Sequence, residues 1–215
     1  MSRTEPDFNL IARPYRWLEY LTLGRSLEDC RNHFLPQLTD RHRALVLGDG
    51  DGRFLAQLLR TNPRLQADAV DTSDTMLRLL CDRCETVAPN ANTRLQTHLC
   101  NALTFPLSGS YDLIVTHFFL DCFSQAELNA LIHRIAKHTH SGTLWLISDF
   151  RIPQGLAQLP AKILVRSLYL AFRFLTGIRT SHLPDHTIPL TKAGFLQIAH
   201  QPRLSGILIS ELWQL

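Results

Sequence analysis

The sequence predicts an α/β fold: a three-layer sandwich in which helices cover both faces of a seven-stranded, mostly parallel sheet. Short apolar runs alternate with helical patterns along the chain, which is typical of strands joined by right-handed helical crossovers. The runs are nearly continuous in apolar residues, which suits strands covered on both faces. The last two runs are separated only by HQPRLSG, which is too short for a helical crossover. They should therefore form an antiparallel hairpin at the end of the sheet.

Seven runs carry the strand pattern. In chain order they are Ala44–Leu47, Ala67–Val70, Leu95–Leu99, Leu113–Thr116, Thr143–Ser148, Phe195–Ala199 and Ile207–Trp213. The first five alternate with helical segments and should form the parallel part of the sheet.

Helical patterns lie between these strands. Ser124 and Glu127 form a Ser-x-x-Glu capping box in front of an amphipathic segment, which predicts a helix there. Ser73 can cap a second helix, Pro63 ends a third, and Ser26 begins a fourth. The expected inward residues are Leu27, Phe34, Leu35 and Leu38; Phe54, Leu55, Leu58 and Leu59; Met76, Leu77 and Leu80; and Leu128, Leu131, Ile132 and Ile135.

Composition limits the class of protein. The 215 residues are 45% hydrophobic and 19% charged, which fits one globular domain and excludes a disordered chain. The net charge of +3 does not by itself call for nucleic acid. No run is long and apolar enough for a plain membrane span, and the first residues lack a signal-peptide pattern. The five cysteines lack a disulfide framework, so we expect a cytoplasmic protein. Cys81 and Cys84 form the only C-x-x-C, and we interpret them as plain buried thiols.

A glycine-rich turn follows the first strand. In VLGDGDG, Gly48, Gly50 and Gly52 alternate with two aspartates between the strand and the next helix. Glycine is favoured where the backbone needs unusual angles or approaches a ligand. A strand, a glycine turn and a helix start together indicate a nucleotide or cofactor site, although a plain strand-to-helix turn remains the alternative.

Polar residues stand at the ends of five successive strands. Asp71 follows the second strand and lies 23 positions after Gly48, close to the spacing at which an acid holds ribose hydroxyls. The other strand-end residues are Asn101 after the third strand, Thr116, His117 and Asp121 at the fourth, and Asp149 at the fifth. Because ligands in such sheets bind beyond the carboxyl ends of the strands, these residues mark the candidate site.

These motifs together resemble those of the class I S-adenosylmethionine-dependent methyltransferases. VLGDGDG is similar to the glycine loop of that family, VDTSDTML to its ribose motif, and YDLIVTHFFLD to its fourth-strand motif. The resemblance implies a Rossmann-like single domain over residues 1–215. Its parts would be an N-terminal helical cap (1–40), a cofactor-binding core (41–150), a helical insertion or lid (151–193) and the terminal hairpin (194–215).

The resemblance also implies roles for single residues, with S-adenosylmethionine as cofactor and S-adenosylhomocysteine as product. Asp71 would accept hydrogen bonds from both ribose hydroxyls, and Thr116 and His117 would face the methionine end and the acceptor. The cofactor-binding residues implied by position are Gly48, Asp49, Gly50, Gly52, Asp71, Thr72, Met76, Asn101, Ala102 and Thr116.

Two positions depart from the family pattern. Val46 stands where the family usually has an acid, so Asp49 or Asp51 would hold the cofactor ammonium instead. Asn101 stands where the adenine residue is often Asp, and its carbonyl oxygen can still accept a hydrogen bond.

Catalysis could use a general base. An in-line methyl transfer depends mostly on positioning, and a base is needed only if the acceptor must lose a proton. His117 and Asp121 are the candidates. The alternative is that Asp121 orients a loop and that His117 makes a hydrogen bond that fixes the backbone.

The acceptor should be a small molecule, and an apolar one is among the interpretations that the sequence allows. Residues 161–176 form a widely hydrophobic helical pattern with a narrow basic stripe, which fits core or lid packing, an apolar acceptor pocket or weak contact with a membrane surface. His182, Asp185 and His186 could touch the acceptor, but no known ligand spacing supports a metal site.

Two rival functions remain on the sequence alone. A nicotinamide-dependent oxidoreductase would share the fold, but GDGDG is not G-x-G-x-x-G. A non-catalytic cofactor-binding protein is suggested by the missing acid at Val46. Nucleic acid is not an expected partner, because no basic cluster with stacking aromatics is present. The sequence does not predict the oligomeric state.

Overall fold

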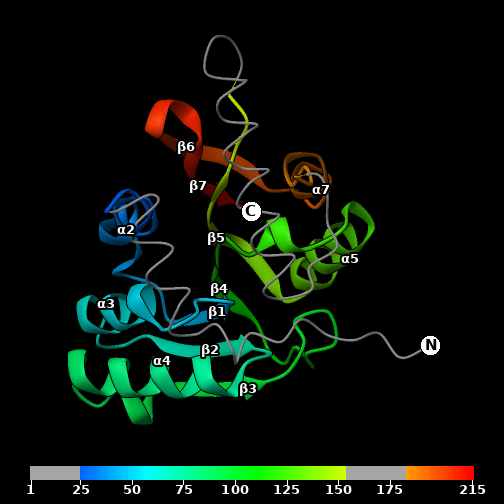
Figure 1. Ribbon diagram of the computed structural model, residues 1–215. Helices are drawn as coiled ribbons and strands as arrows, with labels where there is room; N and C mark the ends of the chain where they lie inside the picture. Colours follow the sequence, from blue (N-terminus) through cyan, green and yellow to red (C-terminus); the bar gives the residue numbers. More distant parts are fainter. Residues whose placement is uncertain (1–24, 154–182) are drawn as a thin grey trace.

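A computed structural model describes residues 25–153 and 183–215. In these residues the chain forms one seven-stranded sheet with the strand order β3-β2-β1-β4-β5-β7-β6 (Figure 1). The strands are β1 (Arg43–Leu47), β2 (Gln66–Asp71), β3 (Leu95–Leu99), β4 (Tyr111–His117), β5 (Thr139–Phe150), β6 (Leu196–Arg203) and β7 (Leu208–Gln214). The first five are parallel, and β7 runs antiparallel to both β5 and β6. The predicted fold class and the C-terminal hairpin are therefore confirmed.

The described helices cover both faces of this sheet (Figure 1). They are α2 (Ser26–Asn32), α3 (Arg53–Thr61), α4 (Asp74–Val87), α5 (Gln125–Ala136) and α7 (Thr187–Lys192), with 3₁₀ turns η1 (Leu35–Leu38), η2 (Ala91–Thr93), η3 (Leu120–Cys122) and η4 (Leu204–Gly206). The helix expected to start at Ser26 is shorter than its apolar pattern suggested. It ends at Asn32, and Pro36, which lacks a backbone donor, stands in the 3₁₀ turn that follows.

Two apolar cores give the sandwich its three layers. Successive residues of a strand point to opposite faces, so Ala44 and Val46 pack with α3 and α4, whereas Leu45 and Leu47 pack with α5 and α7. The predicted inward residues of α3 and α5 are buried. Because both faces are covered, the carboxyl edge of the sheet is the part of the parallel strands left for a ligand.

Two predicted helix caps are present. The Ser124 hydroxyl accepts a hydrogen bond from the amide of Glu127, whose carboxylate accepts from the Ser124 amide at 3.0 Å, so the capping box is complete. The Ser73 hydroxyl accepts from the amide of Met76 at 3.3 Å and caps α4. These caps fix the starts of the helices that follow β2 and β4.

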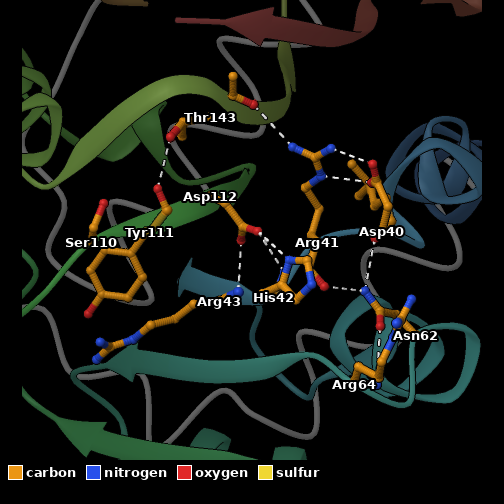
Figure 2. A network of polar contacts seen from close by, with 12 residues as sticks. Asp40, Arg41, His42, Arg43, Asn62, Arg64, Ser110, Tyr111, Asp112 and Thr143 are labelled. Atoms are coloured by element: carbon orange, nitrogen blue, oxygen red, sulfur yellow. Dashed lines mark hydrogen bonds and ion pairs between the residues drawn. The ribbon is translucent and has the colours of Figure 1, made fainter.

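The starting edge of the strands is held by a network of polar contacts (Figure 2). The Asp112 carboxylate accepts hydrogen bonds from the amides of His42 and Arg43 at 2.7 and 2.8 Å. The Thr143 hydroxyl donates to the Tyr111 carbonyl at 2.9 Å. These contacts join the beginnings of β1, β4 and β5. Polar residues at this edge are thus used for the fold, and the candidate site lies at the opposite edge.

Candidate active site

The glycine turn lies between β1 and α3, where the strand order reverses. Gly48, Gly50 and Gly52 have φ of 67°, 60° and 76°, in the left-handed region that glycine adopts at low cost. A side chain at Gly52 would lie 2.8 Å from the Leu80 backbone, so this glycine lets α4 pack against the start of α3. A side chain at Gly50 would meet no atom of the described chain within 4 Å. Gly50 is therefore the glycine that faces open space.

The two aspartates of the turn have different surroundings. Asp51 binds Arg83 at 2.8 Å and Arg53 at 3.2 Å, and so fastens the turn to α4. The carboxyl group of Asp49 is buried. Its Oδ2 accepts from the amide of Leu55 at 3.0 Å, and its Oδ1 has no partner among the residues that the structure describes. Burial raises the pKa of Asp49 to about 7, against smaller opposing effects of the Leu55 amide and the Arg31 charge.

Asp71 closes β2 beside this turn. Its Oδ1 accepts from the amide of Ser73 at 2.9 Å, and its carbonyl accepts from the amide of Cys100 at the end of β3. Burial raises the pKa of Asp71 to about 6, and the amides of Ser73 and Thr72 oppose this rise. The carboxylate is thus held in place by the chain that leads into α4, with the buried Met76 in the first turn of that helix.

Asn101 forms a tight turn after β3. Its side-chain oxygen accepts from the amide of Leu103 at 2.9 Å, and its carbonyl accepts from the amides of Thr104 and Phe105. Ala102 packs in the core on the α5 side of the sheet.

Thr116 and His117 point to opposite faces of the sheet. The Thr116 hydroxyl is buried and accepts from the Trp145 indole at 3.1 Å, on the side covered by α5. His117 packs its ring edge-to-face against Phe54 of α3, with centroids 4.4 Å apart. Neither ring nitrogen of His117 has a partner among the described residues, and the ring is buried. Burial, followed by the charge of Arg31, lowers its pKa well below the usual value.

Asp121 and Asp149 lie together on the α5 side of the same edge. Asp121 sits in η3, and its amide donates to the carboxylate of Asp149, which also accepts from the Phe150 amide at 2.8 Å. Burial, and then the charge of Asp121, raise the pKa of Asp149 well above its usual value. The Cys122 thiol donates to Asp121 at 3.5 Å. The pairing of Asp149 with the η3 turn had no signal in the sequence beyond the position of Asp149 at a strand end.

The strand-end acids form one group. The nearby charge of Asp71 adds to the effect of burial in disfavouring the ionisation of Asp49. Burial, and after it the charges of Asp121, Asp149 and Asp71, raise the pKa of Cys122 well above its usual value. The structure therefore brings together predicted acids at the ends of β1, β2, β4 and β5. Buried carboxyl groups with shifted pKa values are typical of functional sites.

Other predicted candidates have structural partners or lie outside the described residues. His186 binds Glu211 at 2.8 Å, and Asp185 accepts from the amide of Thr187. The segment 161–176 and His182 lie outside the described residues.

Within the described ranges, no group of His, Cys, Asp or Glu side chains could hold a metal ion, and no helix could cross a membrane. Cys84 is a buried free thiol whose pKa burial raises to about 12.

Comparisons with known proteins give a methyltransferase signal. Residues 45–144 match the family model described as a methyltransferase domain. The chain is 33% identical over 90 residues to polyamine aminopropyltransferase 2 of Bacillus cereus, a match that covers 39% of this chain and 25% of that protein. The chain thus matches about a quarter of the length of this curated relative.

Solved structures share the fold over nearly the whole chain. The mitomycin 7-O-methyltransferase MmcR is similar with a TM-score of 0.69 and 14% identity, over 97% of this chain and 60% of that chain. The N-methyltransferase NodS from Bradyrhizobium japonicum, in complex with S-adenosyl-L-homocysteine, has a TM-score of 0.61 and 14% identity, over 87% of both chains. The predicted resemblance to class I S-adenosylmethionine-dependent methyltransferases is confirmed in the domain model and the fold.

Proposed function

We propose that this chain, whose residues 45–144 match the methyltransferase domain, transfers a methyl group from S-adenosylmethionine to a small-molecule acceptor. The observation that carries this proposal is the set of buried polar atoms without partners at the glycine turn. Asp49 Oδ1 and both ring nitrogens of His117 have no partner among the described residues. Such atoms cost free energy in a folded chain unless a ligand satisfies them.

The residues at the strand ends suit this cofactor. The Asp71 carboxylate, held by the Ser73 amide, would accept hydrogen bonds from the ribose hydroxyls. Met76, Asn101 and Ala102 would surround the adenine, with Thr72 beside them. The backbone at Gly48 and Gly50 would lie along the methionine part, and Gly52 would shape the turn. Thr116 has a buried structural partner in Trp145, and a role for it at the methionine end stays a prediction.

Of the two turn acids, Asp49 is the better candidate for the cofactor ammonium. Asp51 is already paired with Arg83 and Arg53. Asp49 keeps one buried oxygen without a partner in the described chain. The position of the usual acid is taken by Val46, which packs in the core on the α3 side. With Asp49 in this role, the valine at position 46 is compatible with cofactor binding by a catalytic protein.

The cofactor supplies an activated methyl group on a sulfonium, so the chain's own residues mainly have to position the acceptor and receive its proton. Asp121 is the candidate proton recipient, because its turn is anchored on Asp149 at the carboxyl edge. His117 is less suited to this role, because its buried ring is a weak base. The pair Asp121 and Asp149 lies on the α5 side of β4, separate from His117 on the α3 side.

The proposal extends to the acceptor class and the compartment. The similar structures named above are an O-methyltransferase and an N-methyltransferase, which favours a small-molecule acceptor with an oxygen or nitrogen nucleophile. An apolar acceptor under a lid at residues 151–193 depends on a segment largely outside the described residues. All five cysteines are free, which supports a reducing, cytoplasmic environment.

The experiment incubates the protein with S-adenosylmethionine labelled in its methyl group and with a small-molecule extract. We expect label in a product identified by mass spectrometry, together with formation of S-adenosylhomocysteine. The matched control is Asp71→Ala, which should lose this turnover. A parallel reaction is supplied with decarboxylated S-adenosylmethionine, whose side chain is an aminopropyl group. An aminopropylated product there, with release of 5′-methylthioadenosine, would instead support the activity named for the Bacillus relative. Absence of any transfer, with NAD bound in place of the cofactor, would contradict the proposal.

A further inference from the structure

A row of apolar side chains crosses the carboxyl edge of the sheet on the face that α2 covers. Phe150 of β5 pairs in register with Leu208 of β7, which pairs in turn with Arg203 of β6. Residues that pair across antiparallel strands point to the same face, so these three side chains are neighbours. The Phe118 ring, which follows β4, packs against the Phe150 ring with centroids 5.1 Å apart. Phe118, Phe150 and Leu208 therefore form one apolar floor.

An arginine lies at each end of the apolar floor. The guanidinium of Arg31 in α2 lies 5.1 Å from the centroid of the Phe118 ring. Arg203, at the β6 end, is half-buried, and its Nε is buried with no hydrogen-bond partner among the described residues. Both arginines lie near Cys30 of α2, since their charges oppose the burial that raises the pKa of this thiol to about 11. A buried guanidinium nitrogen without a partner costs free energy unless a ligand satisfies it.

The acids of this edge belong to the other face of the sheet. Strand alternation sends the Asp149 side chain to the α5 side, whereas the next residue, Phe150, lies on the apolar floor. Glu211 also lies on the α5 side, where it accepts hydrogen bonds from His186 and Trp213 at 2.8 and 2.9 Å. The apolar floor thus combines hydrophobic rings with cationic side chains, which suits a ligand that is both apolar and anionic.

The backbone is strained at both ends of the apolar floor. Phe118 has a φ of 51°, and Leu204 and Ser205, in the turn after β6, have φ of 48° and 54°. These are three of the four non-glycine residues with left-handed φ in the part of the chain that the structure describes. Such strain is typical of ligand sites. An added side chain at Gly48 would overlap the Phe119 ring, so the chain after β4 also adjoins the glycine turn.

We propose that the apolar floor and Arg203 bind the methyl acceptor and select a molecule with an apolar body and an anionic group. The body would lie on Phe118 and Phe150, and the anionic group would accept a hydrogen bond from Arg203 Nε. An oxygen or nitrogen at the other end of the acceptor would form the bond to the methyl group, leave the former bonding pair on the sulfur and pass its proton to Asp121. This inference rests on the proposed function and deepens it by naming the acceptor class.

Two fluorescent dyes separate the anionic group from the apolar body. Anilinonaphthalene sulfonate is an anion, and N-phenylnaphthylamine has the same rings without the sulfonate. We would titrate each dye into the natural protein and into Arg203→Gln, with S-adenosylhomocysteine present throughout. The variant loses a hydrogen bond between charged groups, so the affinity for the sulfonate dye should fall at least about tenfold. The affinity for the neutral dye should change little.

Companion variants make the test specific. Arg203→Lys, which keeps the charge, should recover part of the lost affinity for the sulfonate dye. Phe150→Ala should weaken both dyes, because it removes a ring of the apolar floor. The matched control is Arg60→Gln, which changes an exposed arginine of α3 and should leave both dyes unaffected. The thermal midpoint of each variant shows that it is folded.

The label-transfer experiment gives a second readout. The product identified by mass spectrometry should still contain an anionic group, and Arg203→Gln should raise KM for this acceptor more than it lowers kcat. A labelled product without an anionic group, including a methyl ester formed on the anionic group itself, would contradict the inference.

The dye titrations can also overturn it. An equal loss for both dyes in Arg203→Gln would show that this arginine only supports the fold, and unchanged affinity for both would show that it contacts no anion. A natural protein that binds no sulfonate dye saturably would exclude an anionic site. Failure to bind S-adenosylhomocysteine or to transfer a methyl group would instead overturn the proposed function. The dye comparison does not depend on that binding, so the two failures are distinct.

Discussion

The variant Asp49→Asn tests whether ionisation of the buried Asp49 carboxyl lowers the free energy of unfolding of the protein. The Asp49 carboxyl is buried, and one oxygen accepts from the Leu55 amide at 3.0 Å. Asparagine keeps that acceptor and nearly the same shape but cannot ionise. Any pH-dependent difference between the variant and the natural protein therefore reports the ionisation of Asp49.

The expected change in the free energy of unfolding follows from the shifted pKa of Asp49. Burial raises the pKa of Asp49 from 3.8 to about 7, a difference of about three units, and each unit corresponds to 1.36 kcal/mol. Below about pH 4 the group is protonated in both the folded and the unfolded chain, so ionisation costs nothing. As the pH rises, the unfolded chain releases the proton first, and the folded state loses stability until the pH passes about 7. The free energy of unfolding should therefore fall by about 4 kcal/mol through this one group.

Urea unfolding of the ligand-free protein at a series of pH values measures this difference. Asp49→Asn should be progressively more stable than the natural protein as the pH rises from about 4 to about 8. The matched control is Asp51→Asn, which removes ion pairs to Arg83 and Arg53 and should give no such gain. A stability difference between Asp49→Asn and the natural protein that is the same at every pH would refute the reasoning.

Three further variants have expected outcomes. Asp71→Ala should weaken S-adenosylhomocysteine at least about tenfold in calorimetry, because two hydrogen bonds to a carboxylate are lost; an unchanged affinity would show a plain turn acid. Gly52→Ala should destabilise the protein by more than about 1 kcal/mol in urea unfolding, because its φ is 76° and its new methyl group would lie 2.8 Å from Leu80; natural stability would contradict this packing. Ser124→Ala should cost about 1 kcal/mol through the lost cap and leave ligand affinity intact, and a loss of affinity would contradict a purely structural role.

The sequence predicted the fold because β1, β4 and β5 contain uninterrupted apolar stretches and because strand-like segments alternate with helical patterns. The boundaries were less predictable where polar residues extend a strand. β5 begins at Thr139, ahead of its apolar part, and β6 continues through His200 to Arg203 by pairing with β7. Hydrogen bonds to the neighbouring strands set where β5 begins and β6 ends, and the residues of those strands are not adjacent in the sequence pattern that predicted the runs.

The strand-end residues of the site were predicted in position, but their partners were not. Asp49 and Asp51 are equivalent in the glycine pattern, and only the fold shows that Arg83, 32 positions away, pairs with Asp51. Strand alternation places Thr116 and His117 on opposite faces of the sheet. It does not show that the Trp145 indole donates a hydrogen bond to the Thr116 hydroxyl. The ion pairs and hydrogen bonds of these side chains depend on neighbours that are distant in the sequence, so only the folded structure shows them.

Calorimetric titration of the natural protein with S-adenosylhomocysteine and, separately, with NAD tests the central claim most directly. We predict saturable binding of S-adenosylhomocysteine, because the buried strand-end groups Asp49, Asp71 and His117 suit its ribose and amino-acid end. We predict no comparable binding of NAD. Tight binding of NAD without binding of S-adenosylhomocysteine would contradict a methyltransferase site at this edge of the sheet.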